Sequence, residues 1–327
     1  MVLYSALNAT LREGVRRRHA HNVGDLRTID CHTHLMWYPD HLSEQYADEA
    51  LASKLVKLKR SGGLAYTANL DKHCYDAKPG PHWNAAAYVS RVVVFGIQAK
   101  ASGMWVPNEI IADYAAEHPE KIEGWASVDP TQPDHLEQFD HCVHTLKLKG
   151  LKLGPVYQHF DPQDRKYWPI FRKCQQYGLP IMWHQGTTFP SAAKLKWGMP
   201  LQLEDVAMDF PDLKMIIAHL GHPWETDVMV LIRKCPNLYT DISAVHYRPW
   251  RYWQALVTAM EYGVEHKILP GSDFPSGTMD NIIAGLRNVN KPVQGTGLPT
   301  IPVEVQDMIL YENWKAFFPH WASPGGK

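Results

Sequence analysis

The sequence lacks the features that would make it a disulfide-rich or membrane-spanning protein. It has only five cysteines in 327 residues, and they are widely spaced with no CxxC pair. An odd, scattered set does not form a disulfide framework, so we expect a reducing, cytoplasmic environment. No apolar run approaches the roughly 18 residues of a membrane helix, so no membrane association is expected.

The chain also lacks an excess of charge and any phosphate-binding motif. Its 33 lysines and arginines nearly balance 34 aspartates and glutamates, so a nucleic acid is not an expected partner. No GxGxxG or GxxxxGK[ST] element follows an apolar run, and nothing therefore indicates nucleotide binding. Histidine, in contrast, is abundant, with 18 residues. Because histidine is the commonest metal ligand, this abundance invites a metal or acid–base hypothesis.

Short apolar runs alternate with helical patterns along the chain. The predicted strands are 26–31, 91–97, 122–128, 150–153, 180–183, 214–218, 238–242 and 267–269. The predicted helices are 108–117, 136–148, 168–177, 203–210, 225–234 and 250–262. The runs are continuously apolar, as in strands buried on both faces, and the alternation predicts parallel pairing through helical crossovers.

Eight such units over about 250 residues predict a closed (β/α)8 TIM barrel, with an open doubly wound sheet as the alternative. We expect one domain over residues 1–327. Residues 36–90 are too long for a simple crossover and indicate an insertion after the first strand. The insertion would contain a helix at 48–60 and an aromatic loop around His73, Tyr75, His82 and Trp83. A terminal helix is expected near 303–318.

Histidine and aspartate stand at the ends of four predicted strands, where barrel enzymes carry their active sites. His32 and His34 close the first strand, two residues apart, so both side chains can face the barrel axis. His184, His219 and Asp273 follow the fifth, sixth and eighth strands. Any one of these residues has a structural explanation, but their joint placement predicts a metal site at the rim.

This pattern resembles the amidohydrolase superfamily, and within it the amidohydrolase-related branch that includes the aminocarboxymuconate-semialdehyde decarboxylase group. The matching segments are IDCHTH at 29–34, KGLKLGP at 149–155, MWHQG at 182–186, IIAHLGHPW at 216–224 and GSDFP at 271–275. The resemblance implies a divalent metal held by His32, His34, His184 and Asp273. It implies that His219 is a nearby acid–base or supporting group.

Imidazole and carboxylate ligands suit zinc or manganese, which we expect, and also iron. Asp273 would accept a proton from the activated water, and His219 would stabilise charge on the substrate or protonate the product. One metal is expected. A second metal stays open, because dinuclear members of the superfamily use a carboxylated lysine from strand four. Lys152 and His219 would serve it here, with His159 and His222 as further candidates.

The sequence says less about the substrate and the partners. Arg248 follows the seventh strand and could hold a carboxylate, and Trp224 follows the sixth and could line an apolar pocket. We expect a small-molecule substrate and a homodimer or other oligomer, with a hetero-oligomer also open.

Four functions are compatible with these residues. The leading one is a metal-dependent hydrolase acting on an amide, ester or lactone carbonyl. The main alternative is a non-oxidative decarboxylase of an aromatic or unsaturated acid. A dinuclear Mn/Fe or Fe/Fe oxygen-activating enzyme and a non-catalytic partner subunit are the others.

Overall fold

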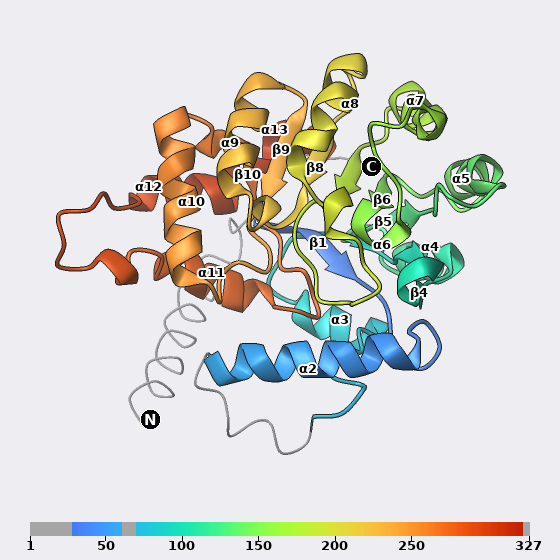
Figure 1. The fold of residues 1–327 in the computed structure, drawn as a ribbon, viewed down its shortest axis with the longest axis horizontal. Helices are drawn as coiled ribbons and strands as arrows, with labels where there is room; N and C mark the ends of the chain where they lie inside the picture. Colours follow the sequence, from blue (N-terminus) through green and yellow to red (C-terminus); the bar gives the residue numbers. More distant parts are fainter. Residues whose placement is uncertain (1–27, 61–69, 323–327) are drawn as a thin grey trace.

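The computed structural model describes residues 28–60 and 70–322, and its centre is a parallel sheet of eight strands (Figure 1). In sheet order the strands are β1 (Ile29–His34), β2 (Arg91–Phe95), β5 (Ile122–Ser127), β6 (Leu151–Leu153), β7 (Ile181–Trp183), β8 (Met215–Ile217), β9 (Leu238–Asp241) and β10 (Ile268–Leu269). A short antiparallel hairpin is formed by β3 (Gln98–Ala99) and β4 (Met104–Trp105).

Backbone hydrogen bonds join the two edges of this sheet. The amide of Cys31 in β1 donates to the carbonyl of Pro270 (3.0 Å), and the amide of His34 donates to Phe274 (2.9 Å). The amide of Asp273 donates in turn to the carbonyl of His32 (2.8 Å). The eight-stranded sheet thus closes into a barrel, which confirms the predicted (β/α)8 fold.

Helices surround the barrel (Figure 1). They are α2 (Glu44–Arg60), α3 (Pro79–Ala85), α4 (Asn108–Glu117), α5 (His135–His144), α6 (Pro155–Gln158), α7 (Trp168–Tyr177), α8 (Glu204–Asp209), α9 (Glu225–Lys234), α10 (Pro249–Tyr262), α11 (Met279–Arg287), α12 (Val303–Asp307), α13 (Trp314–Phe317) and α14 (Pro319–Ala322). None of the helices in the described ranges is both long and apolar enough to cross a membrane.

The observed elements follow the predicted ones closely. The helices predicted at 108–117, 168–177 and 225–234 have the predicted bounds. The first strand lies further along than expected, at Ile29–His34, and residues 26 and 27 of the prediction lie outside the described residues. His82 and Trp83, expected in a loop, lie on α3 instead, where Pro79 stands in the first turn.

The expected terminal helix at 303–318 is interrupted. A π-helical turn at Met308–Glu312 separates α12 from α13. Just after this turn, the side-chain amide of Asn313 donates to the carbonyls of Glu265 and Ile268, both at 2.8 Å. These bonds tie the C-terminal segment to the end of the barrel that is opposite the strand carboxyl termini.

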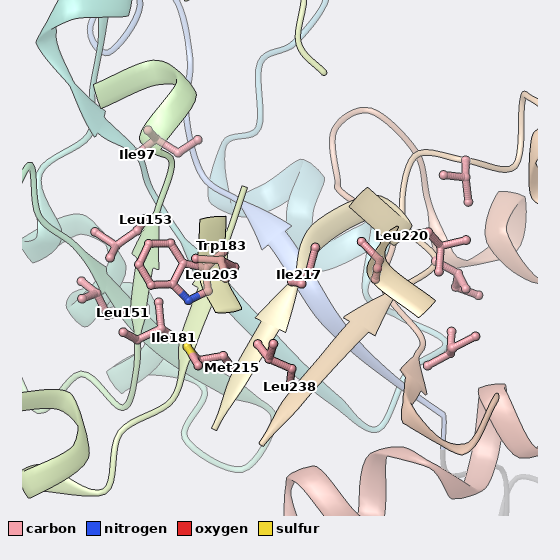
Figure 2. Packing of buried hydrophobic residues seen from close by; sticks show 14 of the residues in the cluster. Ile97, Leu151, Leu153, Ile181, Trp183, Leu203, Met215, Ile217, Leu220 and Leu238 are labelled. Carbon is pink, nitrogen blue, oxygen red and sulfur yellow. The ribbon is translucent and has the colours of Figure 1, made fainter. Parts of the chain in front are cut away.

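Two apolar layers hold the barrel together. Within β7 and β8, Met182 and Ile216 belong to the inner layer, whereas their neighbours in sequence belong to the outer one. Figure 2 shows outer-layer side chains of β6 to β9, among them Ile181, Trp183 and Met215. Phe317 and Phe318 pack against the inner layer and close the amino-terminal end of the barrel. The carboxyl-terminal end is left for polar side chains.

Candidate metal centre

The end of β1 turns two histidines toward the barrel axis. Ile29 and Cys31 belong to the inner layer, and the pairing register with β2 shifts between Asp30 and Thr33. Such a bulge re-aims the side chains that follow it, so His32 and His34 also face inward. Their rings lie 5.2 Å apart between centroids, and both contact Phe95 of β2.

Asp273 completes a compact group with these two histidines. Its Oδ1 lies 3.4 Å from His32 Nε2 and 3.3 Å from His34 Nε2, and the two Nε2 atoms are 3.3 Å apart. Gly271 lets this segment approach β1, because a Cβ there would lie 3.0 Å from the Cβ of His32. The side chain of Asp273 is 15% exposed, whereas that of His32 is fully buried. One carboxylate and two imidazoles therefore converge at the rim.

A second carboxylate, Asp241 at the end of β9, contacts the outer edge of His32. Asp241 Oδ2 lies 2.8 Å from His32 Nδ1. The neighbouring imidazoles hold the pKa of Asp241 well below its usual range, although burial opposes this, so the group is a carboxylate that can only accept. His32 Nδ1 therefore carries the proton, and the lone pair of Nε2 faces Asp273 and His34.

His219 lies beside this pair on the segment after β8, in a left-handed conformation with φ of 59°. Its ring stacks on His32 with centroids 4.9 Å apart, and its amide donates to Asp241 Oδ1 (3.1 Å). Its Nδ1 lies 2.7 Å from Ser243 Oγ. The structure thus brings His219 into the centre, as expected for an acid–base or supporting group.

His184 lies next to the compact group rather than within it. Its ring centroid is 5.0 Å from that of His219. Its Nε2 lies 3.2 Å from the hydroxyl of Tyr157, which also accepts a hydrogen bond from Thr188 Oγ1 (2.7 Å). The two compact ligand groups found among the described residues are His32, His34 and Asp273, and His32, His219 and Asp241.

Lys152, on β6, is buried inside the barrel. Its Nζ lies 3.2 Å from His32 Nε2 and 4.7 Å from the centre of the Phe95 ring. Because an ammonium group can only donate, this contact independently requires a lone pair on His32 Nε2. Burial lowers the pKa of Lys152 to about 8, so the amine is protonated at neutral pH.

The electrostatics of the centre favour neutral histidines and an ionised aspartate. Burial lowers the pKa of His32, His34 and His184, and it lowers the pKa of His219 to about 4. Burial opposes ionisation of Asp273, but the surrounding imidazoles lower its pKa well below the usual range. Neutral imidazole and ionised carboxylate are the states that bind a metal.

This donor set fits a divalent cation. Two imidazole nitrogens and one carboxylate oxygen approach one another within 3.4 Å at a buried rim, and His184 is adjacent. Nitrogen and oxygen donors together suit zinc, manganese or iron better than magnesium or calcium.

The predicted substrate residues and the two further histidine candidates make contacts outside the metal-ligand cluster. Arg248 donates to the carbonyl of Ala244 (2.9 Å). Trp224 precedes α9 and lines a depression between α9 and α10. The two further histidine candidates are engaged elsewhere: His159 Nε2 bonds the carbonyl of Ala192 (2.7 Å), and His222 Nδ1 bonds Glu225 (2.5 Å).

Three residues of the centre were not predicted, namely Asp241, Ser243 and Tyr157. Asp241 could have been found, because it lies at the end of the predicted strand 238–242 and the same rule selected Asp273. Ser243 and Tyr157 carried no comparable signal, since a hydroxyl in a loop or short helix is common. Their placement depends on how the loops fold over the rim.

The closed barrel and its polar rim of histidines and aspartates are the architecture of a (β/α)8 enzyme. The family model described as Amidohydrolase matches residues 29–319, and the chain belongs to this family. The resemblance proposed from the five sequence segments is therefore confirmed.

Solved structures share the fold at low sequence identity. A 5-carboxyvanillate decarboxylase from Sphingomonas paucimobilis is 16% identical with a TM-score of 0.61, covering 90% of this chain and 99% of the other. A protein from Acinetobacter baumannii described as a probable 2-pyrone-4,6-dicarboxylic acid hydrolase is 17% identical, with a TM-score of 0.61 and coverage of 90% and 99%. A dihydroxybenzoic acid decarboxylase from a Polaromonas strain, with bound manganese, is 15% identical, with a TM-score of 0.57 and coverage of 90% and 97%. None of the curated protein sequences matches the chain.

Proposed function

We propose that this chain is a metal-dependent hydrolase that uses one divalent cation at the rim of the barrel. The observation that carries the proposal is the convergence of His32 Nε2, His34 Nε2 and Asp273 Oδ1 within 3.4 Å of one another. His184 would complete the ligand set. Manganese or zinc suits these donors, and iron is also compatible.

A bound divalent cation would supply Lewis acidity, which makes water acidic near neutral pH and polarises a carbonyl oxygen. Asp273 would take the proton of the attacking water, because its carboxylate is ionised and its side chain is partly open to the mouth. His219, neutral at pH 7 with its Nδ1 held by Ser243, would take this proton from Asp273 at Nε2 and deliver it to the leaving group.

A lysine side chain near the metal-ligand cluster supports an anionic substrate. Lys57 of α2 donates to the hydroxyl of Tyr75 (3.0 Å) and lies 5.1 Å from the centre of the Tyr247 ring. Asp273 is among the groups that raise the pKa of Lys57, and the charge of Lys57 helps burial to lower the pKa of His246, so Lys57 faces the side of the barrel that holds the metal-ligand cluster. Within residues 28–60 and 70–322, no carboxylate is at ion-pair distance from Lys57. We propose that Lys57 receives a substrate carboxylate, with Arg248 and Trp224 as further substrate contacts.

The second candidate is a non-oxidative decarboxylase of an aromatic or unsaturated acid. It is favoured by the fold shared with the 5-carboxyvanillate and dihydroxybenzoic acid decarboxylases. In this reaction His219 or Asp273 would deliver a proton to the carbon that loses carbon dioxide. A dinuclear oxygen-activating enzyme would need a second metal at Lys152 and His219, and two ions per chain with oxygen consumption would identify it.

The two candidates are separated by the origin of the oxygen in the product. The purified protein is incubated with 2-pyrone-4,6-dicarboxylate, 5-carboxyvanillate and 2,6-dihydroxybenzoate in ¹⁸O-labelled water. Hydrolysis predicts label in a product carboxylate without gas release, whereas release of carbon dioxide with no label in the remaining organic product indicates decarboxylation. Asp273→Asn should abolish either reaction, and Asp113→Asn, on the exposed surface of α4, is the matched control.

A further inference from the structure

Asp241 receives four hydrogen bonds, and they are divided unequally between its oxygens. Oδ2 accepts from His32 Nδ1 (2.8 Å). Oδ1 accepts from the amide of His219 (3.1 Å), the amide of Ser243 (2.9 Å) and the hydroxyl of Ser243. Asp241 is fully buried, so these partners replace water completely.

The same carboxylate determines where the proton of His219 lies. The single hydroxyl proton of Ser243 is donated to Asp241, so Ser243 Oγ must accept from His219 Nδ1, 2.7 Å away. The carbonyl oxygen of Ser243, 3.3 Å from the same nitrogen, can also only accept. His219 therefore carries its proton on Nδ1 and presents the Nε2 lone pair to the centre, as His32 does.

We propose that Asp241 is a positioning residue that fixes the ring tautomers of His32, directly, and of His219, through Ser243, and thereby sets the affinity for the divalent cation. The affinity part of this inference rests on the proposed metal-dependent function, whereas the tautomer part does not. Second partners of metal-binding histidines typically change metal affinity by about 10–100-fold when they are removed.

The isosteric substitution makes the test sharp. In Asp241→Asn the amide oxygen should stay at the Oδ1 position, because three donors converge there. The amide NH₂ then faces His32 Nδ1, which must become an acceptor, and the proton moves to Nε2. That proton occupies the position of the metal and opposes the ammonium of Lys152, 3.2 Å away. In Asp241→Ala no amide group faces His32 Nδ1, and the hydrogen bond from Lys152 still favours the tautomer with a lone pair on Nε2.

We therefore expect asparagine, although closer in shape, to be worse than alanine. Mn²⁺ affinity, measured by electron paramagnetic resonance titration, should fall about 100-fold in Asp241→Asn and about 10-fold in Asp241→Ala. Ser243→Ala removes a contact of 3.2 Å to His32 Nδ1 but leaves the bond between Asp241 and His32 intact, so its affinity should stay within about threefold of wild type. Asp113→Asn, on the exposed surface of α4, should be unchanged. A purely structural role, or direct metal binding by Asp241, predicts that asparagine retains more affinity than alanine, and that order would overturn the proposal.

A second measurement needs no metal. Long-range ¹H–¹⁵N correlation spectra of chelator-treated, ¹⁵N-histidine-labelled protein distinguish protonated from unprotonated ring nitrogens, with signals assigned by single His→Gln variants. Wild type should carry protons on Nδ1 of His32 and His219. Asp241→Asn should move the His32 proton to Nε2. Ser243 Oγ also lies 3.2 Å from His32 Nδ1, but the shorter bond from this nitrogen to Asp241 remains in Ser243→Ala, so that variant should keep the His32 tautomer and change the protonation of His219. A protonated His32 Nε2 in wild type would refute the tautomer assignment. Correct tautomers without Mn²⁺ binding would instead contradict the metal-dependent function.

Discussion

Replacing Lys152 by methionine should stabilise the metal-free protein. The ammonium of Lys152 is buried with one hydrogen-bond acceptor, His32 Nε2, and one aromatic face, Phe95. Burial lowers its pKa from 10.5 to about 8, and each tenfold change in proton affinity corresponds to about 1.4 kcal/mol, so the charge costs about 3 kcal/mol at neutral pH. Methionine fills a similar volume.

The gain is reduced by the lost hydrogen bond to His32, about 1 kcal/mol, which leaves about 2 kcal/mol. For a chain of 327 residues that is a rise in the melting temperature of about 3 °C. Calorimetry of chelator-treated protein at pH 7 measures it. Wild type should also gain stability as the pH rises above about 8, where the folded lysine gives up its proton before the unfolded one. Lys152→Met should gain less, because Lys267, whose pKa is lowered to about 8 as well, still contributes.

Lys267→Met is the matched control, because hydrogen bonds to two carbonyls offset the cost of its buried charge. Burial lowers the pKa of Lys267 to about 8 as well, but its Nζ donates to the carbonyls of Ile232 (2.7 Å) and Cys235 (2.8 Å). Removing Lys267 relieves a similar charge cost but leaves two buried carbonyls without a donor, which costs about 1–3 kcal/mol, so the melting temperature should change little. If Lys152→Met raised the melting temperature no more than Lys267→Met, the view of Lys152 as a destabilising charge would be wrong.

Lys152→Met also tests the number of metal ions. The ammonium of Lys152 occupies the lone pair of His32 Nε2 and carries a charge of the same sign as the metal. Its removal should therefore strengthen Mn²⁺ binding by about tenfold, which corresponds to roughly one hydrogen bond and the relieved repulsion. Loss of affinity, or of one ion from two, would instead indicate that Lys152 supports a second metal.

Two further predictions concern the scaffold. Burial lowers the pKa of His82, which bonds Thr33 and Tyr114, to about 3. Between pH 6 and 4 this histidine is therefore protonated in the unfolded chain but stays neutral in the folded chain. As the pH falls through this range, the free energy of unfolding of wild type, measured with urea, should decrease by up to about 1.4 kcal/mol more per pH unit than that of His82→Gln. Phe318→Ala should cost about 3–5 kcal/mol, because Phe318 closes the barrel beside Trp125, and equal urea midpoints for variant and wild type would contradict this.

The sequence predicted the barrel because the apolar runs and helix ends that define it are local. Gly178 and Gly263, both with positive φ, end α7 and α10 where the pattern placed the ends. The π-helical turn before Asn313 was not predictable, since its anchor is a contact with Glu265 and Ile268 on a distant segment.

The candidate centre was predicted as a set of strand ends, and the rim does gather His32, His34, His219 and Asp273. The way these residues are held was not predicted. Asp241 acts through hydrogen bonds to two other segments, and periodicity carries no information about such contacts. His184 was expected among the ligands, but its Nε2 is bonded to Tyr157. Its role as a ligand therefore stays a prediction.

The most direct test of the central claim is elemental analysis of the purified protein beside the double variant His32→Ala, His34→Ala. We expect about one manganese, zinc or iron ion per wild-type chain and no bound metal in the variant, with circular dichroism showing that both are folded. A folded double variant that kept its full metal content would contradict the assignment of the centre to these side chains.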